Sequence, residues 1–484
     1  RPQRASPFPA GPPQGKSAPL GGSAVHEVTS PGTRLGTGAA RKGACVSNAV
    51  IASGSLVLML LLIWGGLHVA VVLGLVSFIG VWLIRDDVSV AANLLAAAAN
   101  DAINSHIFGV VPLFVLTGFL VAKADVGKDA FEVANQMFRR LRGGLGIATV
   151  AANAVFAAIT GISIASAAVF TRVAVPQMLR FGYRGGFATG VVAGSSVLGM
   201  LIPPSLLMIL YGFLANQSVG DMFTAGIVPG LMLAIAFALG IVLMAYLRPG
   251  MVFAGGVPVE VDTQDMMGAG TMALKLLPSI VMIVAVLGGL YAGFFTATEA
   301  GAVGAGLALV IALLKRKLDG PGFWSVLTET GHVTVAVSFL IICATIYTRM
   351  LAMSGMPQFL VETMAQAGLG RTAFLLLYVA IVIALGTIID SSSIMLIMLP
   401  LMLPIAEQFG MNLVWFGVVT VIAVEIGLLT PPFGLSVFVI KSTLSEPGIS
   451  LGDIFRGTAP FTLIMLSVLG LLMVFPQICL VLLR

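Results

Sequence analysis

The sequence predicts an all-α polytopic membrane protein with about ten transmembrane helices and two re-entrant hairpins in two inverted repeats. Two observations carry this prediction. Of the 484 residues, 58% are hydrophobic and 9% are charged, which leaves too little charge to cover the surface of a soluble protein. In addition, one motif occurs twice at a constant offset, with proline pairs at Pro203-Pro204 and Pro431-Pro432, since 431 − 203 and 432 − 204 are both 228.

The charge and the cysteine content exclude several other classes of protein. The net charge is +5, but the basic residues lie in a terminal tail and in short loops, as expected for cytoplasmic loops of a membrane protein. We therefore expect no nucleic-acid partner. The three cysteines and four histidines are scattered without the spacing of a disulfide framework, a zinc site or a catalytic triad. The sequence predicts neither an enzyme nor a bound cofactor.

Apolar segments divide the chain into a tail and a transmembrane domain. Residues 1–45 are rich in Pro, Gly, Ser and Arg and are predicted to be a disordered tail, whereas 46–484 form the membrane domain. Ten apolar segments are long enough to cross a bilayer. They are 48–65, 67–84, 107–122, 187–214, 221–247, 276–294, 298–314, 333–352, 413–440 and 459–483.

Two further apolar stretches, 145–171 and 373–405, are interrupted by polar clusters. The first cluster is Thr160–Ser163 with Ser166, and the second is Thr387 with Asp390–Ser393. We interpret both stretches as re-entrant hairpins, because non-helical backbone at membrane depth is tolerated only where protein or a water-filled cavity surrounds it. Polar hairpin tips therefore predict an internal site.

Each proline pair interrupts an apolar helix, because proline lacks a backbone donor and clashes with the preceding turn. Repeat one is expected over about 107–247 and repeat two over about 333–483, each with a hairpin followed by a broken helix. Four crossings lie between the two proline pairs, so the repeats should be inverted. Paired broken helices at corresponding positions are the best pointer from sequence to the binding site of a secondary transporter.

Three carboxylates lie in apolar sequence. Because a charge inside the membrane costs free energy, each of them suggests a functional role. Asp390, beside three serines, suits a hard cation such as sodium, and the alternative role is a helix cap. Glu425 is expected to coordinate an ion, to relay protons or to bond freed backbone donors. Glu299 is expected to be an N-terminal carboxylate with a structural role.

Three segments resemble the large membrane subunit of tripartite ATP-independent periplasmic (TRAP) transporters: Gly199–Ser205, Phe295–Ala300 and Gly427–Gly434. The resemblance runs from about residue 50 to the end. It implies an elevator-type, sodium-driven importer of an organic acid, commonly a carboxylate such as a C4-dicarboxylate, in the bacterial inner membrane. It also implies two partners, a small four-helix membrane subunit and a periplasmic substrate-binding protein.

The resemblance places the ion and substrate site at the two hairpin tips and the two broken helices. The candidate residues are Gly161, Ser163, Ser166, Ser195, Ser196, Gly199, Pro203, Pro204, Ser205, Thr387, Asp390, Ser391, Ser392, Glu425, Gly427, Thr430, Pro431 and Pro432. Among these, Asp390, Ser391 and Thr430 are the candidate sodium ligands. The first tip reads Gly161-Ile162-Ser163 instead of the more usual Gly-Ser-Ser, and so offers fewer hydroxyls.

Two other functions are compatible with parts of the pattern. A stand-alone sodium–carboxylate symporter would share the architecture without needing a binding protein. A non-transporting scaffold or a channel is a second class, but a scaffold needs no polar hairpin tips and a channel needs no matched broken helices.

Overall fold

The computed structural model describes residues 38–104, 109–256, 267–444, 446 and 448–483. The chain separates into two units, Arg1–Ala44 and Cys45–Arg484. The predicted disordered tail lies outside the described residues up to residue 37, and its remaining part, 38–45, belongs to the first helix. Within the described ranges the secondary structure is helical except for one isolated β-bridge between Tyr183 and Phe253.

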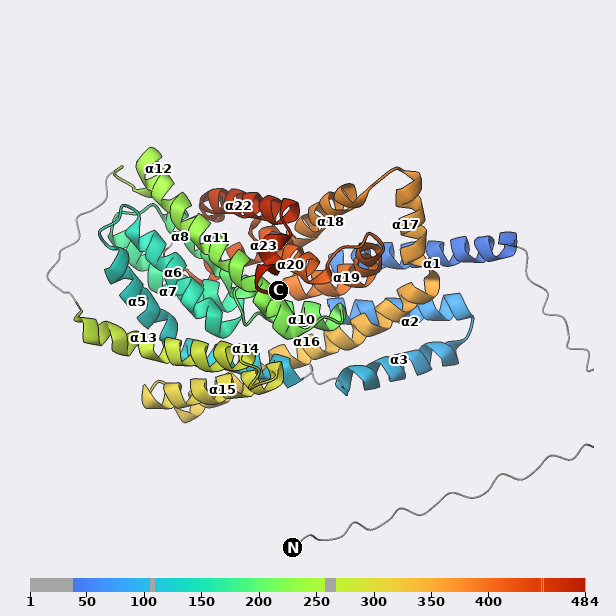
Figure 1. Ribbon diagram of the computed structural model, residues 1–484, viewed down its shortest axis with the longest axis horizontal. Coiled ribbons are helices and arrows are strands. Elements are labelled where there is room, and N and C mark those ends of the chain that lie inside the picture. Colours follow the sequence, from blue (N-terminus) through green and yellow to red (C-terminus); the bar gives the residue numbers. More distant parts are fainter. Residues whose placement is uncertain (1–37, 105–108, 257–266, 445, 447, 484) are drawn as a thin grey trace, which may run out of the picture. The chain divides into compact units, whose positions relative to one another are not determined.

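Most of the helices follow one another through short connections (Figure 1). In chain order the elements are α1 (Gly38–Trp64), α2 (Val69–Arg85), α3 (Val88–Ile103), α4 (Val110–Lys123), α5 (Val126–Phe138), α6 (Gly144–Thr160), α7 (Ser163–Arg180), α8 (Gly185–Ser196), α9 (Leu198–Leu201), α10 (Leu206–Leu214), α11 (Val219–Leu247), α12 (Pro249–Val252), α13 (Ala269–Ile283), the π-helix η2 (Val284–Gly288), α14 (Gly289–Tyr291), α15 (Ala297–Leu314), α16 (Gly320–Ser354), α17 (Met356–Gln366), α18 (Arg371–Gly386), α19 (Ser391–Gln408), α20 (Leu413–Leu429), α21 (Leu435–Thr443), α22 (Leu451–Val474), α23 (Gln477–Leu480) and the 3₁₀-helix η3 (Val481–Leu483).

The constant offset of the sequence motif also recurs in the helix boundaries. Helix α19 begins and ends at this offset from α7, since 391 − 163 and 408 − 180 are both 228. Helix α20 begins at the same offset from the start of α8 and ends at the same offset from the end of α9, since 413 − 185 and 429 − 201 are both 228. The repeated motif therefore marks a repeated unit of structure, a helical hairpin followed by a broken helix.

Both predicted helix breaks are present at the proline pairs. After α9 the backbone becomes extended at Ile202, and Ser205 then caps α10 by accepting a hydrogen bond from the Met208 N–H at 3.2 Å. The segments Gly185–Leu201 and Leu206–Leu214 meet at a bend of 42°. In the second break, Thr430 is extended and α21 starts only after Gly434. Both Pro-Pro peptide bonds are cis.

Fewer helices than the ten predicted crossings meet the length of a membrane span. Among the described residues, six helices are long and apolar enough, or up to eight if each of two bent pairs counts as one span. Part of the difference arises because the segments predicted at 67–84 and 413–440 contain apolar helices of at most 17 residues. For the last of these, the second proline pair divides one apolar segment into α20 and α21.

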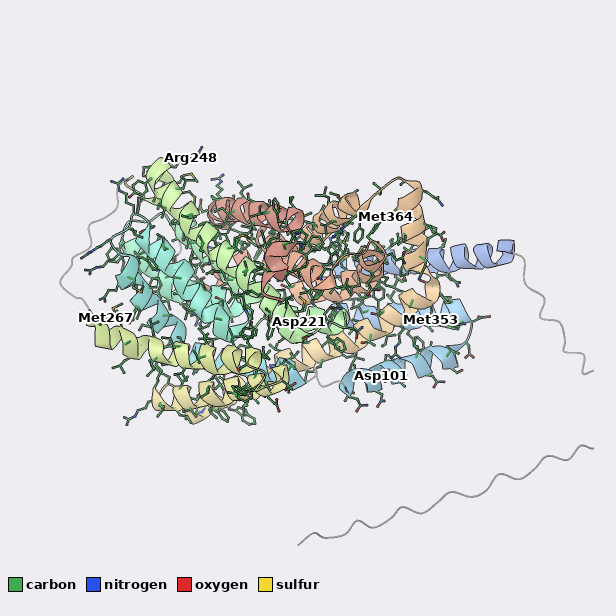
Figure 2. The ribbon with its side chains drawn as sticks, viewed as in Figure 1. Asp101, Asp221, Arg248, Met267, Met353 and Met364 are labelled. Carbon is green, nitrogen blue, oxygen red and sulfur yellow. The ribbon has the colours of Figure 1, made fainter. Side chains whose placement is uncertain are left out.

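The hairpins and broken helices form the interior of the unit Cys45–Arg484. Helix α20 is buried along its whole length from Val414 to Leu429, and α8 is buried from Phe187 to Ser196. Around them, the 35-residue helix α16 packs against α2, α3, α4 and α19. The long helix α11 packs against α22 and runs from Asp221 in its first turn to Arg248 at its C-cap (Figure 2). The polar tips therefore lie inside helical protein, as the sequence predicts.

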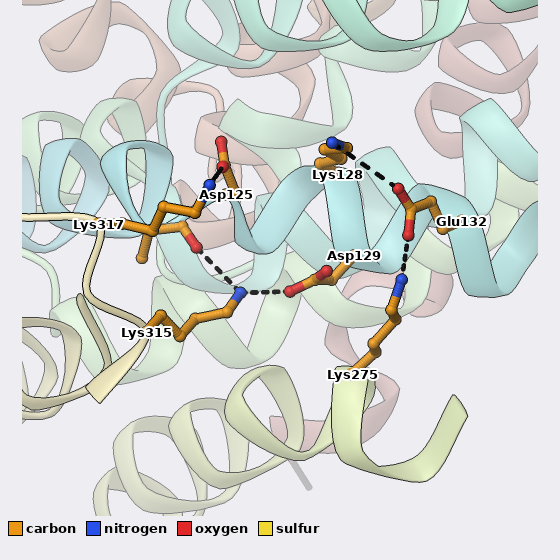
Figure 3. Close-up of polar contacts among 8 residues, drawn as sticks. Asp125, Lys128, Asp129, Glu132, Lys275, Lys315 and Lys317 are labelled. Atoms are coloured by element: carbon orange, nitrogen blue, oxygen red, sulfur yellow. Dashed lines mark hydrogen bonds and ion pairs between the residues drawn. The ribbon is translucent and has the colours of Figure 1, made fainter. Parts of the chain in front are cut away.

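Helix α5, between the first membrane segment of repeat one and its hairpin, is held by ion pairs (Figure 3). Its acidic residues Asp129 and Glu132 pair with Lys315 and Lys275, and Asp125 just before it pairs with Lys317 at 2.8 Å. The hydrogen bond from Lys317 to Asp125 raises the pKa of that lysine. The positions 228 residues after Asp125, Asp129 and Glu132 are uncharged: Met353 lies at the end of α16, and Pro357 and Leu360 lie in α17.

Candidate functional site

The first hairpin tip lies directly against the first helix break. Gly161 ends α6 with a φ of +66°, and its carbonyl oxygen accepts a hydrogen bond from the Leu206 N–H at 3.2 Å. A Cβ atom at position 161 would lie 2.3 Å from the carbonyl oxygen of Pro204. Only glycine fits here, because any side chain would be strained by both the backbone conformation and the contact. On the other side of the tip, a Cβ atom at Gly199 would lie 3.1 Å from the Ile162 carbonyl.

The second hairpin tip meets the second break in a related way. The carbonyl oxygen of Thr387 accepts a hydrogen bond from the Gly434 N–H at 3.2 Å, and Gly434 is the counterpart of Leu206 in repeat two, since 434 − 206 is again 228. Helices α18 and α20 also approach closely at two glycines. A Cβ atom at Gly427 would lie 2.5 Å from the Cα atom of Gly386. Each tip is therefore attached by a main-chain hydrogen bond to the break in its own repeat.

One buried carboxylate links the two hairpins. Glu425, in α20, is fully buried, and its Oε1 accepts hydrogen bonds from the hydroxyls of Ser163 at 3.4 Å and Ser391 at 3.5 Å. These serines are the first helical residues of α7 and α19, so the positive ends of two helix dipoles lie beside the carboxylate. The second oxygen, Oε2, is buried and has no hydrogen-bond partner among the described residues.

This arrangement is asymmetric although the helices around it repeat. The counterpart of Glu425 in repeat one is Val197, since 425 − 197 is 228, so a single carboxylate serves both hairpins. A buried charge without a full set of partners costs several kcal/mol. Hydroxyl and carboxylate oxygens are the ligands that hard cations prefer. The free carboxylate oxygen therefore suits a cation or a proton.

Asp390 has the geometry of a helix cap. Its Oδ2 accepts a hydrogen bond from the Ser393 N–H at 3.1 Å and its Oδ1 accepts one from the Ser393 hydroxyl at 2.5 Å. The helix cap is one of the two roles that the sequence allows for Asp390. The other role, sodium binding, stays a prediction. Ser393 belongs to the predicted polar cluster but is not among the candidate site residues, although an aspartate before an apolar helix is a recognisable N-cap signal.

Two of the candidate hydroxyls in repeat one belong to a network centred on a residue that sequence reasoning missed. The side-chain amide of Asn153, in α6, donates to the Ser195 hydroxyl at 2.5 Å and its oxygen accepts a hydrogen bond from the Ser166 hydroxyl. All three side chains are buried, so the network joins α6, α7 and α8. The available signal was the single amide within the apolar sequence of α6.

The other candidate hydroxyls mainly satisfy the backbone of their own segment. Four of them donate to a carbonyl three to five residues earlier: Ser196 to Ala193 at 2.8 Å, Ser205 to Met200 at 2.5 Å, Thr387 to Ala384 at 2.8 Å and Thr430 to Ile426 at 2.7 Å. Ser392 is half-buried in the first turn of α19. Since each donor hydroxyl keeps free lone pairs, these contacts leave it able to accept a further partner.

Glu299 has the structural role expected from the sequence. Its Oε2 accepts a hydrogen bond from the Thr296 N–H at 2.8 Å, while its own N–H donates to the Thr296 hydroxyl at 3.3 Å. This is a capping box at the start of α15. Glu299 therefore caps a helix, whereas Glu425 caps none and keeps one buried oxygen without a partner among the described residues.

The segment that contains the hairpin tips and helix breaks also matches a known protein family along most of its sequence. Residues 56–478 match the family described as "Tripartite ATP-independent periplasmic transporter, DctM component". The chain belongs to the DctM family. It is thus a transport protein and not an enzyme, with several membrane spans in the bacterial inner membrane.

Several proteins of this kind are similar to the chain. It is 34% identical over 375 residues to the C4-dicarboxylate TRAP transporter large permease protein DctM of Pseudomonas aeruginosa, which covers 77% of this chain and 85% of that relative. It is 30% identical over 395 residues to the sialic acid TRAP transporter large permease protein SiaM of Vibrio cholerae, covering 81% and 90%. The ectoine TRAP transporter large permease protein TeaC of Halomonas elongata is 29% identical over 371 residues, covering 76% and 84%.

Two solved structures share the fold of this DctM-family chain. The YdaH transporter of Alcanivorax borkumensis superposes with a TM-score of 0.54 at 14% identity, covering 88% of this chain and 97% of that one. MtrF of Neisseria gonorrhoeae, described as belonging to a class of antimetabolite efflux pumps, gives a TM-score of 0.52 at 12% identity, covering 82% and 85%. The predicted all-α membrane-transporter fold is therefore confirmed.

Proposed function

We propose that this DctM-family permease imports an organic acid across the inner membrane, driven by a sodium gradient. The observation that carries this proposal is the buried Glu425 carboxylate between Ser163 and Ser391. One oxygen accepts from both hairpin tips, and the other has no partner among the described residues, which leaves it available to a coupling cation. Relatives named for C4-dicarboxylate and sialic acid transport support an organic acid as the substrate.

The proposed sodium sites lie where each tip meets its broken helix. The first combines Ser163 with the stretch Ser195–Pro204, and the second combines Asp390–Ser392 with Gly427–Pro432. Much of the coordination would come from backbone carbonyls, because the helix breaks free them from helical hydrogen bonds. Main-chain contacts between tip and break, such as Leu206 N–H to Gly161 O, support the view that each pair acts as one unit.

For the mechanism, we propose an elevator in which the two hairpin and broken-helix units move together against the surrounding helices. Repeat one (about 107–247) and repeat two (about 333–483) would be inverted in the membrane, so that the same machinery opens alternately to either side. The shared carboxylate supports movement as a single body, since Glu425 joins the first residues of α7 and α19.

The family description is tripartite, and we propose two partners accordingly. One is a small four-helix membrane subunit, and the other is a periplasmic binding protein that delivers the substrate. A stand-alone symporter would need neither, so reconstitution from separate components distinguishes the two.

The test is uptake of labelled succinate and of labelled sialic acid into proteoliposomes under an inward sodium gradient. The chain is reconstituted alone, with the small subunit, and with both partners. We expect uptake only with all three components, and only when sodium rather than potassium forms the gradient. Uptake by the chain alone would establish the stand-alone symporter instead, and uptake without sodium would refute the coupling.

A further inference from the structure

A cleft of about 390 Å³ lies between α4, the hairpin arm α7 and the first half of α16. Its polar lining consists of Lys123, Arg172, Ser325 and Glu329, and apolar side chains such as Phe119 and Val326 complete the wall. Helix α7 starts at the hairpin tip, whereas α4 and α16 belong to the helices around the hairpins. The cleft therefore separates the proposed moving unit from its surroundings.

Arg172 brings a charge without a partner into this cleft. Within the part of the chain that the structure describes, its guanidinium forms neither an ion pair nor a hydrogen bond, although acidic partners satisfy several other basic residues. Glu329, on the opposite wall, accepts a hydrogen bond from the Ser325 hydroxyl at 3.2 Å. Arg172 follows Ser163 at the tip by nine residues, about 13 Å along the helix axis.

The corresponding place in repeat two lacks this positive charge. At +228, Arg172 becomes Pro400 and Lys123 becomes Leu351. Pro400 also lines a cleft beside α16, but that cleft measures only about 170 Å³ and its charged residue is Glu407. Packing of the repeated helices therefore does not require an arginine at this position, and the cationic lining is specific to repeat one.

The position of the cleft indicates which side of the membrane it serves. Gly322, at the start of α16, lines the cleft together with Lys123, and α16 follows the basic turn Lys315–Lys317 that the positive-inside rule places in the cytoplasm. In the other half of α16, Thr348 lines the smaller cleft together with Pro400 of α19, the equivalent arm of repeat two. The larger opening between a hairpin arm and α16 is thus at the predicted cytoplasmic end.

We propose that this cleft binds the carboxylate of the transported acid on its way to the cytoplasm, with Arg172 as the principal contact and Lys123 as the second. The inference rests on the proposed function, because it takes an organic acid as the substrate. The planar fork of arginine matches a carboxylate in two parallel hydrogen bonds. Glu329 faces the same space, and its negative charge keeps the acid from being held too tightly to leave.

The test is equilibrium binding of labelled succinate, and of labelled sialic acid, to the detergent-solubilised chain in saturating sodium. For Arg172→Gln we expect at least tenfold weaker binding of the acid that the wild type transports, with Arg172→Lys in between. Glu329→Gln should bind it more tightly. The matched control is Arg180→Gln, at the end of the same helix and outside the cleft, which should bind like the wild type.

The same variants are then compared in sodium-driven uptake. Arg172→Gln should raise the KM for the acid and leave the sodium concentration for half-maximal uptake unchanged, which separates the cleft from the sodium sites. Wild-type affinity in Arg172→Gln, or equal losses in Arg172→Gln and Arg180→Gln, would overturn the inference. If Arg172→Gln does not fold, Lys123→Gln and Glu329→Gln must shift the affinity for the acid in opposite directions. Shifts in the same direction would overturn the inference.

Failure of the proposed function gives a different result, because the wild type itself then takes up neither acid.

Discussion

Ser163 and Ser391 occupy equivalent positions in the two repeats, and their hydroxyls donate to the same atom, Oε1 of Glu425. The two serines are the first residues of two 18-residue helices. A change at this carboxylate therefore reaches both hairpins at once. In the mechanism that we propose, this relationship lets two tips from distant parts of the sequence respond together to one coupling cation.

Replacing Glu425 with glutamine should strongly reduce sodium-driven uptake, by at least tenfold, while the protein still folds. Glutamine keeps the size and an acceptor for the two serines, but it removes the charge that we assign to cation binding. Uptake in proteoliposomes measures the effect, and the yield of monodisperse protein reports folding. Glu299→Gln is the matched control, since it changes a carboxylate that caps α15 and should transport normally. Normal uptake by the Glu425→Gln variant would remove this residue from the coupling site.

Asp390 permits a separation of capping from ion binding. Asp390→Asn keeps an oxygen that accepts from Ser393, whereas Asp390→Ala removes the cap at a cost of about 1 kcal/mol. If Asp390 binds sodium, both variants should raise the sodium concentration needed for half-maximal uptake. If it is a cap alone, Asn should behave like the wild type and only Ala should lower the Tm. Sodium titrations of uptake distinguish the two results.

Gly161→Ala should destabilise the first hairpin tip. The new Cβ would meet the Pro204 carbonyl, and alanine disfavours a φ of +66°, so we expect a loss of about 1–3 kcal/mol. The control is Gly306→Ala in α15, where nothing lies within 4 Å of the added atom and alanine favours the helix. Thermal unfolding in detergent should show a lower Tm for Gly161→Ala only. Equal Tm values would show that the tip tolerates a side chain.

Asn153→Ile should lower stability by about 1–3 kcal/mol, because the Ser166 hydroxyl loses its acceptor in a buried site and the Ser195 hydroxyl keeps only its bonds to carbonyls of its own helix. Isoleucine is the residue that repeat two carries at the equivalent position, 381, so the fold accepts its shape there. Asn104→Ala, at the exposed end of α3, serves as the control and should leave the Tm unchanged. An unaltered Tm for Asn153→Ile would mean that the network contributes nothing to stability.

Much of the architecture was predictable because its signals are local in the sequence. Proline pairs break helices wherever they occur in apolar sequence, and the constant offset between the two copies of the motif identified the repeat. The exact number of spans was not predictable, because the sequence showed the break at the second proline pair but not the lengths of the helices on either side of it, α20 and α21.

The candidate site was predictable in its location but not in its contacts. The sequence showed Glu425 within apolar residues, but not that it meets Ser163, which lies 262 residues away. Asn153 gave only a weak signal, since a lone amide in an apolar helix has no local partner. Such contacts arise from packing between helices, which periodicity and spacing do not encode.

The most direct test of the account is the sodium dependence of acid uptake by the complete three-component system, measured at a fixed membrane potential. We predict a saturable increase of the initial rate with external sodium, which Glu425→Gln abolishes and Glu299→Gln preserves. A rate that stays constant as sodium is replaced by potassium would contradict the account.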